Sequence, residues 1–87
     1  MNFEYDPDKS ASNKSKHGIE FEEAKALWLD RNKIIVKASD TTEPRQMVIG
    51  LIDKKHWSAV ITQRAENIRI ISVRRSREGE IRHYESD

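Results

Sequence analysis

Four short runs of apolar, mostly β-branched residues between residues 33 and 75 constrain this chain of 87 residues more than any other feature. Within the runs, apolar residues tend to alternate with polar ones, and a period of two is typical of a strand with one buried face. Only short connections separate the runs, the longest being a turn-rich loop at residues 39–44. The pattern predicts four strands in an antiparallel meander. The runs cover residues 33–38, 45–52, 56–64 and 67–75.

The last two of these strands, with a turn at residues 65–67, carry arginines among their β-branched residues. Alternation places Val60, Thr62 and Arg64 on one face of the first strand of this pair. In the second strand it places Ile68, Ile70, Ser72 and Arg74 opposite Arg69, Ile71, Val73 and Arg75. Arginine is planar, permanently charged and suited to a bidentate grip on phosphate. The pair of strands therefore predicts a sheet surface that holds a polyanion.

The region before the strands predicts two helices. Asp6 can cap a first helix over about residues 7–16, where Pro7 suits the first helical position and Gly18 suits the end. A second helix is predicted over residues 21–29, since its apolar residues recur at the spacing of an amphipathic face. These apolar residues are Phe21, Ala24, Leu27 and Trp28.

Two terminal segments complete the fold prediction. Residues 1–5 alternate Phe3 and Tyr5 with polar residues, as a short edge strand does, and Ile81 and Tyr84 have a spacing that allows a short C-terminal helix. We predict an α+β fold for residues 1–87 as a single domain. Its two N-terminal helices pack on a four-stranded antiparallel meander, and a short C-terminal helix follows.

Composition excludes several classes of protein. The chain has no cysteine, which excludes disulfides and thiolate metal sites. No apolar run approaches the roughly 20 residues that span a bilayer, and no signal-peptide pattern is visible, so a cytoplasmic location without membrane contact is expected. The net charge of +1 hides an asymmetry. Residues 1–30 contain four lysines and seven acidic residues, a net charge of −3. Residues 54–77 contain seven lysines and arginines and one acidic residue, a net charge of +6. The basic segment predicts an anionic partner.

Several motifs, in their order and spacing, resemble the BrnT family of bacterial type II toxins. They are YDPDK with Asn13 and Lys16-His17-Gly18, then FEEA, Ile49-Gly50, Thr62-x-Arg64, IRIISVRR and the terminal Glu80…Tyr84-Glu85. The resemblance implies a metal-independent ribonuclease toxin with a RelE-like fold, which cleaves RNA and inhibits translation and growth. It also implies neutralisation by a BrnA-like antitoxin with a ribbon-helix-helix domain, in a hetero-oligomer that contacts DNA only through the antitoxin. Two departures from the family pattern are Glu20, where serine is common, and Ala65, where glycine is common.

RNA cleavage without a metal requires a base for the 2′-hydroxyl, a group that stabilises charge on the phosphate, and an acid for the leaving oxygen. For charge stabilisation we predict Arg64 and Arg74 at an RNA phosphate. Arg69, Arg75 and Lys54 are expected to bind RNA. Pairing of these arginines with a helix carboxylate such as Glu22 or Glu23 is the structural alternative. For Arg69 the sequence does not decide between this pairing and RNA binding.

The general base is left open among Lys55, His56 and His17. Histidine has the better intrinsic pKa, a lysine needs nearby cations to lower its pKa, and His17 is well placed to cap a helix end. Tyr84 is expected either to stack on a base or to pack in the core, whereas Trp28 and Trp57 are expected in the core. The histidines show no ligand spacing, so no metal or other cofactor is expected.

Two further hypotheses compete with the ribonuclease. One is a non-catalytic module whose basic patch docks an acidic partner or nucleic acid. The other is a structural subunit that depends on assembly because its core is small, since hydrophobic residues make up 36% of the chain.

Overall fold

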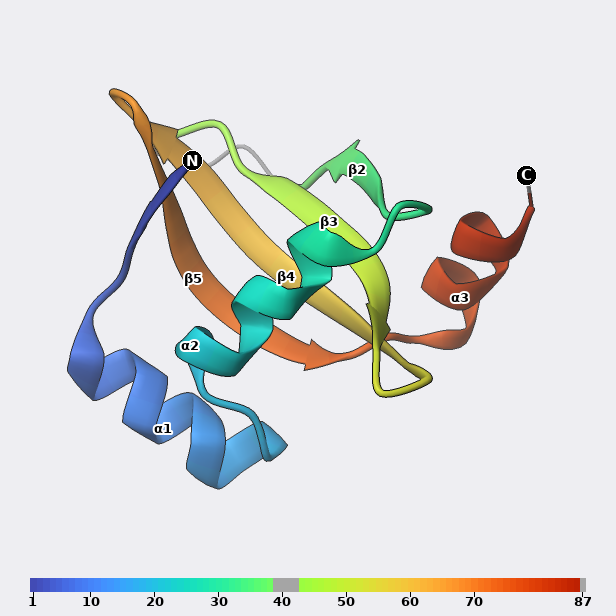
Figure 1. Cartoon of the computed structure of the whole chain (residues 1–87), viewed down its shortest axis with the longest axis horizontal. Coiled ribbons are helices and arrows are strands. Elements are labelled where there is room, and N and C mark those ends of the chain that lie inside the picture. Colours follow the sequence, from blue (N-terminus) through green and yellow to red (C-terminus); the bar gives the residue numbers. More distant parts are fainter. Residues whose placement is uncertain (39–42, 87) are drawn as a thin grey trace.

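The computed structural model describes residues 1–38 and 43–86 of the chain (Figure 1). In these residues it shows a mixed α+β architecture with a five-stranded sheet in the order β1-β5-β4-β3-β2. The strands are β1 (Asn2–Glu4), β2 (Ile34–Lys37), β3 (Gln46–Ile52), β4 (Lys55–Arg64) and β5 (Asn67–Arg75). The helices are α1 (Pro7–His17), α2 (Phe21–Ala24), the 3-10 helix η1 (Lys25–Leu29) and α3 (Glu78–Glu85).

The predicted meander is confirmed as β2 to β5, but a wholly antiparallel sheet of four strands is wrong. The short N-terminal strand β1 adds a fifth strand, and it pairs in parallel with β5. Phe3 alternates with polar neighbours, so the edge-strand pattern was visible in the sequence, but the pairing partner was not. Phe3 lies opposite Ile68 and meets the ring of Trp28 edge-on at 4.8 Å between centroids. This contact ties β1 to η1 and to the sheet.

A β-bulge in β5 changes the alternation that the sequence predicted for this strand. Val60 pairs with Ser72 and Ile61 pairs with Ile70, so Ile71 is an extra residue. The bulge moves Val73 to the same face as Ile70, and both side chains are buried. The prediction that Ile70 and Val73 lie on opposite faces is therefore wrong, because strict alternation cannot anticipate an inserted residue.

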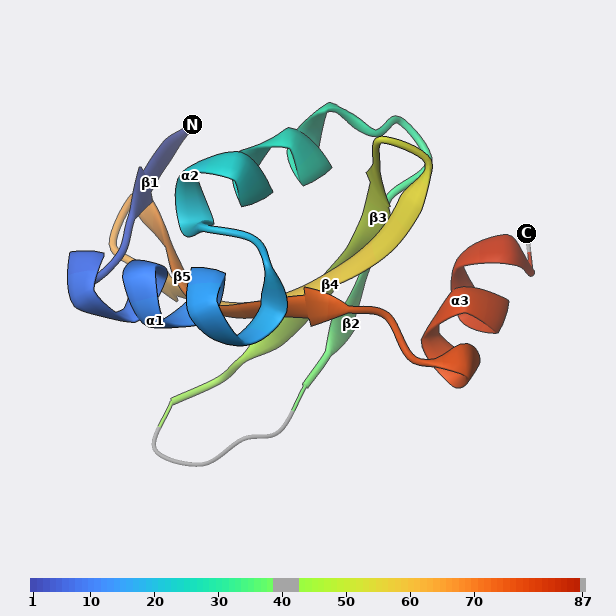
Figure 2. The same cartoon turned by 90° about the horizontal axis from the view of Figure 1, so that it is seen from below.

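Helices α1, α2 and η1 cover one face of the sheet, whereas α3 lies apart from them beyond the end of β5 (Figure 2). Trp57, Ala59 and Ile61 of β4 point toward the first three helices and belong to the core. We call this the helix face. The other face, called the opposite face, carries His56, Ser58, Val60, Thr62 and Arg64 of β4 and their cross-strand neighbours.

The second predicted helix is shorter as an α-helix than expected, because the chain tightens into η1 after Ala24. This tightening brings the end of η1 against β3 at Gly50. A Cβ atom on Gly50 would lie 3.1 Å from Asp30 Oδ2 and 3.2 Å from Leu27 Cδ2. The absence of a side chain at Gly50 thus allows η1 to approach β3 closely, and β3 and β4 pair there without a register shift.

Helix α1 is fixed to the sheet by a buried asparagine. Asn13 Nδ2 donates to the carbonyl oxygens of Val73 and Ile19, each at 2.9 Å, and Asn13 Oδ1 accepts from Val73 N at 3.1 Å. Because β1 pairs only with the start of β5, the rest of that edge would otherwise expose unpaired backbone groups. The Asn13 side chain therefore satisfies the edge as a neighbouring strand would.

The remaining elements agree with their predictions. Asp6 caps α1 by accepting from Asp8 N, and Gly18 ends this helix at φ +80°. The C-terminal helix is confirmed as α3. The predicted loop at 39–44 lies largely outside the described residues. No helix in residues 1–38 or 43–86 is both long enough and apolar enough to cross a membrane.

Candidate functional site

One end of the opposite face gathers polar side chains from β4, β5 and α3. Ser58 and Arg74 are direct cross-strand neighbours. His56 lies two residues before Ser58 on the same face, so its Cα is roughly 7–8 Å from that of Arg74 along the diagonal. Ser76 N donates to the His56 carbonyl at 3.0 Å, which continues the pairing beyond β5. The fold thus brings His56 and Arg74, two of the predicted catalytic residues, to one end of one face.

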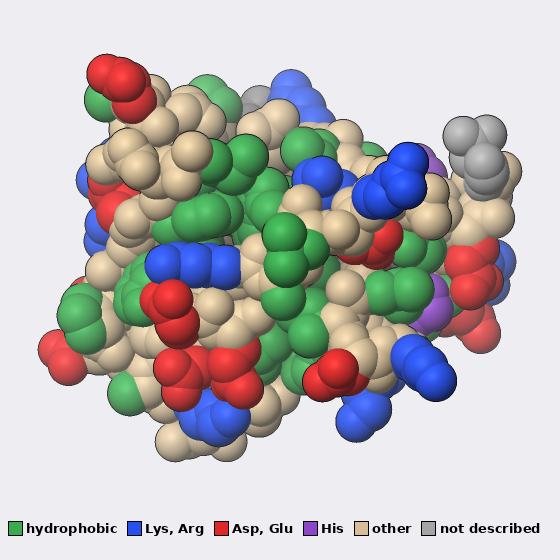
Figure 3. All heavy atoms as spheres, in the orientation of Figure 1, with side chains coloured by type: hydrophobic (Ala, Val, Ile, Leu, Met, Phe, Trp, Pro, Cys, Tyr) green, Lys and Arg blue, Asp and Glu red, His purple; other side chains and the backbone are tan. Residues whose placement is uncertain are grey.

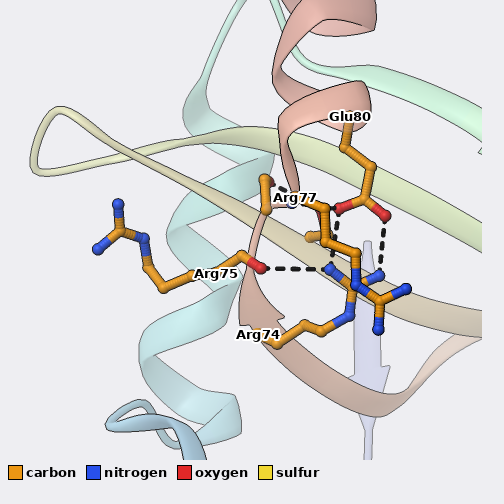
Figure 4. A network of polar contacts seen from close by, with 6 residues as sticks. Arg74, Arg75, Arg77 and Glu80 are labelled. Atoms are coloured by element: carbon orange, nitrogen blue, oxygen red, sulfur yellow. Dashed lines mark hydrogen bonds and ion pairs between the residues drawn. The ribbon is translucent and has the colours of Figure 1, made fainter.

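Glu80 of α3 holds the guanidinium of Arg74 (Figure 4). Arg74 Nη1 donates to Glu80 Oε1 at 2.9 Å and Nη2 donates to Oε2 at 2.8 Å, while Nη1 also donates to the Arg75 carbonyl at 3.2 Å. Oε1 further accepts from the Ser58 hydroxyl at 2.8 Å and from Arg77 N at 2.9 Å. Since Ser58 gives its proton to Glu80, the Ser76 hydroxyl donates to Ser58 at 2.7 Å. Glu80 therefore joins the start of α3 to both central strands.

The electrostatics of this pair follow from its geometry. The two hydrogen bonds from Arg74 are the main reason why the pKa of Glu80 falls from 4.5 to about 2, against the opposing effect of burial. The same contacts raise the pKa of Arg74. The side chains are only 23% and 19% exposed, so solvent screens the pair weakly. Of the five guanidinium donors, three are used, which leaves two free to meet an anion.

Tyr84 of α3 lies against His56 with its hydroxyl on Asp30. The His56 and Tyr84 ring centroids are 5.3 Å apart in an edge-to-face arrangement, and the Tyr84 hydroxyl donates to Asp30 Oδ2 at 2.6 Å. Burial, together with this hydrogen bond, raises the pKa of Tyr84 to about 12. His56 Nε2 also lies 3.5 Å from Glu85 Oε2. Helix α3 therefore places one carboxylate and one phenol ring beside the histidine.

Two of the other predicted residues at this end point elsewhere. Lys55 and Arg75 belong to the helix face, since each lies one residue from a residue of the opposite face. Arg75 extends away from Arg74 (Figure 4). It stacks over Trp57, with its Cζ 5.5 Å from the ring centroid. Lys54 lies in the turn before β4 with φ +67° and is exposed.

Arg64 and Arg69 lie at the far end of the hairpin. Arg64 pairs with Asn67, whereas Arg74 pairs with Ser58, six residues away along β4. At about 3.3 Å per residue this separation is about 20 Å, so Arg64 and Arg74 cannot contact one phosphate, as the sequence had suggested. Each arginine has its own carboxylate, namely Glu43 for Arg64 at 3.6 Å and Glu4 for Arg69 at 2.9 Å.

The helix carboxylates expected as arginine partners have other contacts. Glu23 pairs with Lys14 at 2.9 Å and Glu22 pairs with Lys25 at 3.0 Å. Acidic side chains gather over α1 and α2 in Figure 3, on the side of the sheet that these helices cover. The alternative pairing of sheet arginines with Glu22 or Glu23 is therefore wrong, although arginine pairing itself does occur.

Three aromatic or histidine predictions also have a place in the structure. Trp57 is buried in the core and Trp28 packs against it, as predicted. His17 is exposed in the last turn of α1, whereas His56 lies on β4. Tyr84 packs its ring against His56, so its ring is not free of protein contacts.

Sequence reasoning missed the roles of four polar residues: Ser58, Glu80, Asp30 and Arg45. Glu80 stands three residues after the N-cap Arg77 and accepts from its backbone N–H, and this spacing is the only local signal for its role. Asp30 accepts from Leu51 N at 2.8 Å as well as from Tyr84, and these hydrogen bonds lower its pKa even though burial opposes the change. Such long-range partners leave no trace in a single sequence.

Together the fold and site define a small α+β protein whose sheet presents arginines and a histidine on the face away from its N-terminal helices. No three His, Asp or Glu side chains in the described part of the chain are grouped to hold a metal ion. The sequence model of the BrnT ribonuclease toxins of type II toxin–antitoxin systems matches residues 5–80, so the chain belongs to this family. A comparison with curated proteins gives no significant match.

Proposed function

We propose that this protein is a metal-independent endoribonuclease that cleaves RNA in the cytoplasm, inhibits translation and growth, and is neutralised by a cognate antitoxin. One observation carries the proposal. In a chain of a ribonuclease toxin family, His56 and Arg74 come together on one face and at one end of the sheet. A histidine beside an arginine supplies both proton transfer and charge stabilisation to a phosphodiester.

In the proposed reaction the 2′-oxygen of the substrate attacks the adjacent phosphorus and the bond to the 5′-oxygen breaks. His56 takes the proton of the 2′-hydroxyl, and the two free N–H donors of Arg74 stabilise the negative charge that develops on the phosphate. Lys54 lies two residues before His56 in an exposed turn and is the candidate to protonate the leaving oxygen. The products are a 2′,3′-cyclic phosphate and a 5′-hydroxyl.

Support for His56 over the other candidate bases is geometric. Lys55 lies on the helix face and His17 lies on α1, whereas His56 shares the opposite face with Arg74. The pairing of Arg74 with Glu80 keeps the guanidinium plane fixed, which is the preorganisation that charge stabilisation requires.

The experiment incubates the purified protein with a labelled RNA in excess EDTA and identifies the ends of the products. Cleavage to 2′,3′-cyclic phosphate ends supports the proposal. His56→Ala and Arg74→Gln are each expected to lower the rate by about 10²-fold or more, because each removes a group that acts in the transition state. His83→Ala, which removes an exposed histidine of α3, is the matched control. Intact RNA at high protein excess would favour the alternative of a non-catalytic binding module.

The family also implies an antitoxin, since its members belong to type II toxin–antitoxin systems. We propose that this partner is a BrnA-like ribbon-helix-helix protein that binds the toxin in a hetero-oligomer and provides all contacts to DNA. Co-expression tests the proposal. A ribbon-helix-helix protein encoded beside the toxin should restore growth and copurify with it, and growth arrest that persists during co-expression would contradict it.

A further inference from the structure

Arg45, Arg64 and Arg69 form a second group of guanidinium side chains, at the end of the opposite face away from α3. Thr62 pairs with Arg69 in the register of β4 and β5. Thr62 Oγ1 donates to the Pro44 carbonyl at 2.8 Å, which holds the residue before Arg45 against the same point. The register of β3 and β4 ends with Gln46 opposite Ile61, and one further residue on each strand places Arg45 in the row of Thr62 and Arg69. Arg64 follows in the next row.

Arg45 is the unusual member of this group. Its side chain is half-buried, and its Nε atom is buried without any hydrogen-bond acceptor in the described residues. No described carboxylate forms an ion pair with it. A guanidinium donor removed from water without an acceptor is costly, and native proteins rarely leave one unsatisfied. Because the Nε atom is shielded from solvent, an anion would reach Arg45 at the exposed part of its side chain, whose charge no described carboxylate pairs.

The neighbouring carboxylates do not neutralise the group. Arg69 is paired with Glu4 at 2.9 Å, and both oxygens of Glu4 are used, since the second accepts from Asn67. Arg64 is half-exposed and meets Glu43 only at 3.6 Å, which is longer than a hydrogen bond. Among the described residues, the three arginines and these two carboxylates leave the group with a formal charge of +1, so a further anion is favoured there.

We propose that Arg45, Arg64 and Arg69 bind a backbone phosphate of single-stranded RNA at least one nucleotide away from the phosphate at Arg74. The inference rests on the proposed ribonuclease function and assigns Arg64 to substrate binding instead of cleavage. The rows of Ser58 and Thr62 are four residues apart on β4, which is about 13 Å. One phosphate cannot span this distance, so the two groups of arginines meet different nucleotides.

RNA fits this surface better than an acidic protein segment does, because both arginine groups lie on the face that carries His56. Between them lie Met47 and Val60, which are half-buried and apolar, and Ser72. An RNA strand that follows β4 meets cations at each end and an apolar surface for its bases in the middle. A row of cations that follows the RNA backbone is one part of how proteins bind single strands without reading their sequence.

The test measures binding of a 12-nucleotide 2′-O-methyl RNA by fluorescence anisotropy. This RNA cannot be cleaved, since the attacking hydroxyl is blocked, so the result does not depend on catalysis. Arg45→Gln and Arg64→Gln are each expected to weaken binding about tenfold at low salt, because each removes charged hydrogen bonds to a phosphate. Each should also reduce the slope of log affinity against log salt by about 0.7. Arg82→Gln removes a 71%-exposed arginine from α3 and is the matched control.

The outcomes separate this inference from the proposed function. Unchanged affinity and salt slope in both Arg45→Gln and Arg64→Gln overturn it, even if RNA is cleaved. Weaker binding in these variants supports the phosphate site, even if the protein cleaves no RNA. If the variants bind RNA normally but lose affinity for the antitoxin, the surface belongs to the acidic protein partner and the inference is wrong. Because Arg64 is exposed, its variant should keep the native melting temperature, so a folding defect in Arg45→Gln leaves the test intact.

Discussion

Replacement of Glu80 by glutamine tests how α3 is held to the sheet. The folded protein lowers the pKa of this carboxyl from 4.5 to about 2. Each pH unit between the folded and unfolded pKa corresponds to about 1.4 kcal/mol, so the ionised Glu80 contributes about 3 kcal/mol to the free energy of unfolding at neutral pH. Its side chain is 19% exposed, and solvent therefore reduces this value little. Glu80→Gln should lose about this amount.

The pH dependence gives the sign of the effect. Because the folded pKa is lower than the unfolded one, the stabilisation is complete above pH 4.5 and is lost as the pH falls toward 2. Urea unfolding followed by circular dichroism should therefore show a difference of about 3 kcal/mol between wild type and Glu80→Gln at pH 7. The difference should shrink steadily between pH 4.5 and pH 2. Other carboxylates with lowered pKa values, such as Glu4 and Asp30, affect both proteins equally and cancel.

Glu78→Gln is the control for this experiment. Glu78 belongs to the same helix and also pairs with an arginine, Arg82, but the two side chains are 86% and 71% exposed. Such a surface pair contributes less than about 1 kcal/mol. Equal losses in Glu80→Gln and Glu78→Gln, or a wild-type advantage that does not depend on pH below 4.5, would refute the reasoning.

Three further substitutions test the fold. Asn13→Leu removes three buried hydrogen bonds, two of them to Val73, and should lower the free energy of unfolding by about 3 kcal/mol in urea titrations. A loss below about 1 kcal/mol would contradict the role of Asn13 at the β5 edge. Gly50→Ala places a Cβ 3.1 Å from Asp30 Oδ2 and should lower the free energy of unfolding by about 1–3 kcal/mol, measured as a lower melting temperature. An unchanged melting temperature would show that η1 can move away from β3 at no cost. Ala65→Gly removes the strain of a left-handed alanine at φ +54° and should raise the free energy of unfolding by about 0.5–1 kcal/mol, measured as a higher melting temperature. A lower melting temperature would contradict the strain at Ala65.

The Ala65 conformation also explains one departure from the family pattern. Glycine is common at this position in the family, and the turn between β4 and β5 places residue 65 at a positive φ. Only glycine adopts this conformation without cost, so the chain accepts strain there. The turn is nevertheless formed, because the pairing of β4 with β5 on either side outweighs a cost of about 1 kcal/mol.

Local patterns in the sequence determined the secondary structure. Period-two alternation located the four strands of the meander within about a residue of their ends, and Asp6, Pro7 and Gly18 located α1. These signals work because each depends on neighbours within one turn or one strand. The family resemblance was likewise visible, since it rests on the order of short motifs. The matching family model confirms it.

Only the tertiary structure decided which arginines belong together and what each one meets. The sequence placed Arg64 and Arg74 at one phosphate, but the hairpin register puts them at opposite ends of β4. Pairing of Arg74 with Glu80 and of Arg69 with Glu4 depends on where α3 and β1 dock. Docking depends on contacts between residues far apart in the chain, and no local period or spacing records them. For the same reason the buried Nε of Arg45, which has no acceptor among the described residues, appeared only once the strands were assembled.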